Sequence, residues 1–206
     1  MDNAGPELIE AEPTNSLKDI LINLDEKLKD KEGIKPSQAW RYREEVKAKY
    51  HLPECGYMWS DPERYIKEAE KYAKAHGIQI RPKHEFQGYF GMEEHRDAEA
   101  VSLSENVFRN NTVVVARASQ SDWYGLRRRA KQFAHELVHA IQGEKYPRMP
   151  LEKAEREAYY YQMLTPHFFI KHRDNPDFVS HYLNTVIPRG IKSSCEIARK
   201  SEEKKE

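Results

Sequence analysis

The 206-residue sequence lacks long hydrophobic runs and is poor in cysteine. It contains no stretch of about 18 apolar residues, and its N-terminus has no apolar signal-peptide core, so neither a membrane span nor secretion is expected. The only cysteines, Cys55 and Cys195, are far apart and outside any C-x-x-C motif. This spacing argues against a disulfide framework and a cysteine zinc site, and we expect reduced thiols in a cytoplasmic protein.

Net charge is also absent, because 34 Lys and Arg residues balance 34 Asp and Glu residues. A broad electrostatic surface for nucleic acid is therefore not expected. The clearest local basic cluster is Arg127, Arg128 and Arg129. We interpret it as a solvated helix face rather than as an anion site.

No Gly/Ser linker or internal repeat divides the chain, so residues 16–198 are expected to form a single domain. Residues 1–15 are acidic and contain proline, and residues 199–206 are almost entirely charged. Such compositions favour disorder, and we expect both segments to be tails.

The hydrophobic pattern predicts helices followed by a small sheet. Ser16 should cap a first amphipathic helix, a second should follow Pro36, and a third should run from Ser60 to Gly77. Four short apolar or alternating runs then predict strands, at residues 78–82, 86–92, 98–103 and 112–116. We expect an α+β fold with a small, mostly antiparallel sheet of about four strands, two further helices and a helical C-terminal segment.

One motif indicates a metal-binding site. His135-Glu136-Leu137-Val138-His139 has the H-E-x-x-H pattern of zinc enzymes and lies within a strongly helical run. Residues four apart lie on one face of a helix, so both imidazoles can approach a single Zn²⁺ ion. Zinc lowers the pKa of bound water from about 15.7 to about 7. Glu136 is then suited to act as general base and acid in peptide-bond hydrolysis.

Catalytic zinc requires a third protein ligand, with one position left open. We expect Gly143 to end the zinc helix and residues 151–164 to form a second helix carrying Glu152, Glu155 and Glu157. Glu155 is the preferred ligand because small alanines on its face allow close approach of the two helices. Glu157 remains an alternative, whereas Glu152 is interpreted as a first-turn acid that favours the helix dipole.

A third histidine ligand is not expected, because H-E-x-x-H-x-x-G-x-x-H would require a glycine and a histidine further along. Gln142 and Lys145 stand at those two positions. The histidine-histidine-glutamate arrangement therefore remains the prediction.

The basic, aromatic lead-in at residues 127–134, the HELVH motif, the run Glu155-Arg156-Glu157-Ala158 and the later Pro166 together resemble the IrrE/ImmA-type gluzincins. The resemblance covers roughly residues 61–166. It implies a zincin-like metallopeptidase core in which an edge strand before the zinc helix binds extended substrate. Residues 112–116 are our candidate for that strand, although a covered structural strand is an equal alternative.

The sequence departs from this family at Tyr159, where an asparagine or aspartate usually follows the glutamate by four residues, and at Val138, where a small residue is common. Tyr159, Tyr160, Tyr161 and His167 are alternative donors to the oxyanion of the reaction, or members of a packed aromatic cluster.

The sequence thus predicts a zinc metalloendopeptidase that acts on a protein or peptide, with His135, His139 and Glu155 as ligands and Glu136 as the catalytic residue. Two alternatives remain: a non-proteolytic zinc-bound regulatory or binding protein on a protease scaffold, and a DNA-associated protease. The balanced charge disfavours the second.

Overall fold

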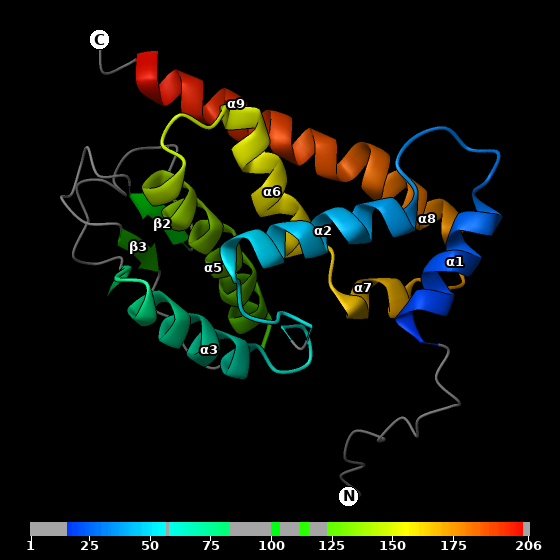
Figure 1. The fold of residues 1–206 in the computed structure, drawn as a ribbon, viewed down its shortest axis with the longest axis horizontal. Helices are drawn as coiled ribbons and strands as arrows, with labels where there is room; N and C mark the ends of the chain where they lie inside the picture. The colour runs from blue at the N-terminus through cyan, green and yellow to red at the C-terminus, as the bar shows by residue number, and fades with distance from the viewer. Residues whose placement is uncertain (1–15, 57, 83–99, 104–111, 116–122, 204–206) are drawn as a thin grey trace, which may run out of the picture.

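A computed structural model describes residues 16–56, 58–82, 100–103, 112–115 and 123–203 of the chain (Figure 1). Helices make up most of this part of the chain. None of the described helices is both long and apolar enough to cross a membrane.

Helices α1 (Leu17–Lys27) and α2 (Pro36–Tyr50) begin where capping chemistry predicts. Ser16 forms a capping box with Asp19, which satisfies backbone donors at the start of α1. Pro36 occupies the first turn of α2, where a missing N–H costs nothing. The predicted helices after Ser16 and Pro36 are therefore confirmed.

Helix α3 (Pro62–Ala75) is capped by Asp61, whose side chain accepts a hydrogen bond from the Arg64 N–H group. It begins slightly later than the predicted Ser60. The chain leaves the helix through Gly77, whose φ of +68° is a left-handed conformation that glycine adopts without a Cβ penalty.

The expected α+β class with about four strands is wrong, because the described chain is predominantly helical. Its strands are three four-residue segments: β1 (Gln79–Pro82), β2 (Ala100–Leu103) and β3 (Thr112–Val115). The strand expected at residues 86–92 lies outside the described residues. The sequence pattern overstated the sheet because helix faces supply nearly all the side chains of the two described hydrophobic clusters.

The sheet is mixed rather than mostly antiparallel. Its strand order is β1-β3-β2, with β1 parallel and β2 antiparallel to β3. Strand β3 therefore has a partner on each side, so the hypothesis that residues 112–116 form a free edge for substrate is wrong.

Helix α5 (Trp123–Lys145) carries the H-E-x-x-H motif and packs against α3, β2 and β3. Its apolar residues recur every three or four positions and form a buried stripe: Ala130, Phe133, Leu137, Ala140 and Ile141. The helix continues through Gly143 to Lys145, so the prediction that Gly143 ends it is wrong. An exposed glycine inside a helix costs only about 1 kcal/mol relative to alanine, which the packing of α5 outweighs.

Helix α6 (Leu151–Met163) lies against both α5 and α9 (Ile187–Glu203) and so connects two hydrophobic clusters (Figure 1). Its Ala158 and Tyr161 join the cluster formed with α2, α3 and α5. Its Tyr160 joins the cluster formed with α1, α9 and three short elements. These elements are α7 (Pro166–Lys171), α8 (Pro176–His181) and the π-helical turn η3 (Tyr182–Val186).

Helix α9 extends to Glu203, into the segment that we expected to be a charged tail. Cys55 and Cys195 are both buried and unpaired, which confirms the expectation of free thiols.

Candidate metal centre

His135 and His139 lie one turn apart on α5 and turn their imidazoles toward each other. Their Nε2 atoms are 3.0 Å apart. This proximity follows from the four-residue spacing, which places side chains on one face of a helix. The structure therefore brings together the two histidines of the motif.

Glu155 reaches the same point from α6. Its Oε2 atom is 3.3 Å from Nε2 of His135, and its Oε1 atom is 3.4 Å from Nε2 of His139. The turn after α5 reverses the chain, so that α6 packs back onto α5. Among the described residues, these three side chains form a group able to hold a metal ion.

The separations of the donor atoms fit zinc. Vertices at roughly 2.0–2.1 Å from the centre of a tetrahedron lie about 3.3–3.4 Å apart, and those radii are ordinary zinc–imidazole and zinc–carboxylate distances. Here the two Nε2 atoms are 3.0 Å apart, and each lies 3.3 or 3.4 Å from a different oxygen of the Glu155 carboxylate. Moreover, the buried Oε2 atom of Glu155 has no hydrogen-bond partner, and a cation between the three groups would supply one.

Glu155 and His139 are electrostatically coupled. Burial opposes protonation of His139, but the hydrogen bond and negative charge of Glu155, with a further contribution from Glu136, raise the pKa of His139 to about 9. Burial likewise opposes ionisation of Glu155, but the nearby imidazoles of His135 and His139 lower the pKa of Glu155 to about 2. At neutral pH the metal-free site therefore carries a proton that a bound cation must displace.

Glu136 follows His135 directly on α5 and is partly buried. Burial is the main cause of the raised pKa of Tyr159, and the negative charge of Glu136 adds to it, as it adds to the raised pKa of His139. The Glu136 carboxylate is thus close enough to the candidate metal centre to interact electrostatically with His139 and with Tyr159.

The other two glutamates of α6 lie outside the metal group. Glu157 is buried and faces α2, from which it accepts hydrogen bonds from Lys49 and Tyr50. Glu152 is exposed and pairs with Arg156 at 2.7 Å. The geometry therefore favours Glu155 over Glu157 as a metal ligand.

Of the four candidate oxyanion donors, Tyr159 is the one whose described contacts include a candidate ligand. Its ring meets that of His135 edge to face, with centroids 4.9 Å apart, and its hydroxyl lies 3.1 Å from Ser194 Oγ on α9. Tyr160 packs in the second hydrophobic cluster, and Tyr161 donates a hydrogen bond to the Pro53 carbonyl. His167 is exposed.

Gln142 is a site residue that sequence reasoning missed. We considered it only as a substitution for the glycine of a different motif, yet its Oε1 atom lies 2.8 Å from Nδ1 of His139. The three-residue spacing from His139, about one helical turn, was the available signal.

Arg127 also departs from our interpretation of a wholly solvated basic face. Its Nε donates a hydrogen bond to the Trp59 carbonyl at 2.8 Å, and its guanidinium lies over the Trp59 ring. Arg128, by contrast, is exposed.

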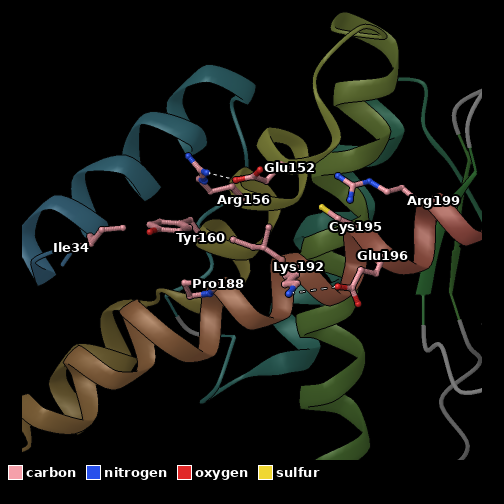
Figure 2. A pocket seen from close by; sticks show the side chains of 10 residues that line it. Ile34, Glu152, Arg156, Tyr160, Pro188, Lys192, Cys195, Glu196 and Arg199 are labelled. Atoms are coloured by element: carbon pink, nitrogen blue, oxygen red, sulfur yellow. Dashed lines mark hydrogen bonds and ion pairs between the residues drawn. The ribbon is translucent and has the colours of Figure 1, made fainter. Parts of the chain in front are cut away.

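A pocket of about 550 Å³ lies between α6, α9 and Ile34 (Figure 2). The side of α6 that lines it carries Glu152, Arg156 and Tyr160. Glu155 and Tyr159 lie on the neighbouring face of the same helix. None of the three candidate metal ligands lines this pocket.

No family model, curated protein or solved structure matches the chain. The resemblance to gluzincins consequently depends on the sequence motifs alone.

Proposed function

We propose that the chain is a zinc-dependent metallopeptidase that hydrolyses a peptide bond in a protein or peptide. The proposal is carried by one observation: two histidines and a glutamate from neighbouring helices converge, with 3.0 Å between the imidazole nitrogens and 3.3 or 3.4 Å from each nitrogen to a carboxylate oxygen, close to the spacing of tetrahedral zinc ligands. His135, His139 and Glu155 would hold the ion.

The number of ligands favours a catalytic over a structural role. Structural zinc is normally closed by four protein ligands, whereas catalytic sites have three and an open position. The group found among the described residues has three members. The side chains of His135 and His139 retain 12% and 18% exposure, which leaves them within reach of water.

Hydrolysis joins the oxygen of water to the scissile carbonyl carbon and breaks the bond from that carbon to the amide nitrogen. A bound zinc ion would supply acidification of water and polarisation of the carbonyl. The Glu136 carboxylate would take the proton from the attacking water and deliver it to the leaving nitrogen. Tyr159 beside His135 is a candidate donor to the developing oxyanion.

The test compares wild type with Glu136→Gln and, as a matched control, Glu152→Gln, which changes an exposed glutamate of α6. Zinc content is measured by elemental analysis, and cleavage of a mixed peptide library is read by mass spectrometry. We expect all three proteins to bind about one zinc ion and only Glu136→Gln to lose cleavage, by at least about 100-fold. Unchanged cleavage by Glu136→Gln would remove Glu136 from the mechanism.

A non-proteolytic zinc-bound regulator is the alternative. It predicts stoichiometric zinc in the wild type without cleavage of any library peptide. The same experiment therefore separates the two functions.

A further inference from the structure

We propose that Gln142 and Glu157 form a hydrogen-bonded link that positions His139 for metal binding and anchors it to α2. The inference rests on the proposed zinc site and assigns a positioning role to two residues that are not ligands. Both are buried, with 3% exposure each.

The first step of the link determines the tautomer of His139. Gln142 Nε2 faces two groups that only accept hydrogen bonds: the Ala154 carbonyl oxygen at 3.2 Å and Glu157 Oε2 at 3.0 Å. This arrangement identifies the atom facing His139 as the amide oxygen. Nδ1 of His139 must then donate to Gln142 Oε1, over 2.8 Å.

A neutral imidazole that donates through Nδ1 has its lone pair on Nε2. Nε2 of His139 is the atom that faces His135 and Glu155. Gln142 therefore selects the tautomer and ring orientation that a metal ion at this centre requires.

The second step fixes Gln142 itself. Glu157 accepts hydrogen bonds from Gln142 through Oε2, from Lys49 at 2.9 Å through Oε1, and from the Tyr50 hydroxyl. Lys49 and Tyr50 belong to the last turn of α2 and are more than 100 residues from Glu157 in sequence. The link thus extends from the metal centre across α6 to α2.

Groups that hold a metal-bound histidine commonly affect metal affinity by about 10- to 100-fold, because they fix the ring and raise its basicity. The same contacts also hold α2 against α6, so a loss of stability alone would not establish positioning. The test therefore requires a control that removes a comparable buried hydrogen bond away from His139. Tyr161→Phe is suitable, since its hydroxyl donates to the Pro53 carbonyl at 2.8 Å.

Zinc affinity of the full chain is measured by competition with a chromophoric chelator. We expect Gln142→Leu to weaken zinc binding by about 10- to 100-fold, and Tyr161→Phe to change it by less than about threefold. Equal losses in the two variants, or no loss in Gln142→Leu, would overturn the link. Failure of the wild type to bind zinc would instead overturn the proposed function and the link together.

An exchanged pair provides the rescue. In Gln142→Glu/Glu157→Gln, a carboxylate at position 142 accepts from His139 and from the amide at position 157, and that amide accepts from Lys49; the Ala154 carbonyl alone loses its donor. The single variant Gln142→Glu places its new carboxylate beside that of Glu157. We expect the double variant to bind zinc more tightly than Gln142→Glu and more tightly than Gln142→Leu. The link would be contradicted if the double variant bound zinc no more tightly than Gln142→Leu and Gln142→Glu do.

A spectroscopic readout is independent of affinity. In the zinc-loaded, ¹⁵N-labelled wild type, the His139 Nδ1–H proton should give an exchange-protected NMR signal. We expect this signal to disappear in Gln142→Leu and to persist in Tyr161→Phe. Its persistence in Gln142→Leu would show that another group holds the ring.

Discussion

The Nε2 atoms of His135 and His139 lie 3.0 Å apart and share the carboxylate of Glu155 as a neighbour. Two protonated imidazoles at that separation would repel each other strongly, because both are substantially buried. The metal-free arrangement therefore accommodates one proton rather than two, and a bound metal ion would have to replace that proton.

The role of Glu155 as a ligand is tested by Glu155→Gln, which removes the anionic donor and keeps nearly the same volume. We expect zinc affinity to fall by more than about 100-fold, which exceeds the effect of typical supporting residues. Chelator competition provides the measurement. Glu152→Gln is the control, because this exposed glutamate pairs with Arg156 outside the metal group. Equal affinities for Glu155→Gln and wild type would exclude Glu155 as a ligand.

The affinity for zinc should increase with pH. His139 is protonated in the metal-free chain below its pKa of about 9, and zinc binds only the neutral ring. Affinity should therefore rise as pH increases from 6 toward 9, by about tenfold per pH unit for one displaced proton. Calorimetry in buffers of different ionisation enthalpy measures the proton release. A value near zero at pH 7 would contradict the prediction.

Gly190 has a packing role beside the candidate centre. A Cβ atom at this position would lie 2.7 Å from Tyr159 Cε1, and the ring is also in contact with His135. Although alanine favours helices, we expect Gly190→Ala to destabilise the fold by about 1–3 kcal/mol through overpacking. Urea denaturation measures the effect. Gly143→Ala, at an exposed helical position, should be neutral or stabilising. Stabilisation by Gly190→Ala would contradict the close contact.

Glu54 should make stability depend on acid pH. Burial opposes its ionisation, but a hydrogen bond from Lys47 and the charges of Arg43 and Lys47 lower its pKa. A carboxyl group with a lowered folded-state pKa contributes stability above its unfolded value, near 4.3, and that contribution is lost as pH falls through the folded value.

We therefore expect wild type to lose more free energy of unfolding between pH 6 and pH 3 than Glu54→Gln does. Urea denaturation at several pH values gives the two curves. Glu45→Gln, on the exposed side of α2, is the control and should follow the wild type. Parallel curves for wild type and Glu54→Gln would refute the prediction.

Local patterns predicted the helices well, because their signals are contained within a few residues. Ser16 with Asp19 and Pro36 mark helix starts, and the spacing of Phe133, Leu137 and Ile141 marks a buried helix face. Gly143 misled us because local propensity is weak compared with the packing that continues α5 to Lys145.

The sheet was predicted less well, because strand pairing joins residues distant in sequence. The apolar runs at 78–82, 98–103 and 112–116 contain the strands β1, β2 and β3, but the order of the strands was not apparent from the pattern. The structure places β3 between β1 and β2, which favours a covered structural strand over a free edge, the two interpretations that the sequence left open for residues 112–116.

The sequence alone determined that His135 and His139 share a helix face, because that relationship requires only the helical period of α5. Only the tertiary structure decided which glutamate joins them. Glu155 and Glu157 both lie on buried faces of α6, and the packing of α6 against α5 and α2 directs the first toward the histidines and the second toward Lys49 and Tyr50. Gln142 has its role for the same reason, since contacts between helices, rather than the local pattern, place it between His139 and Glu157.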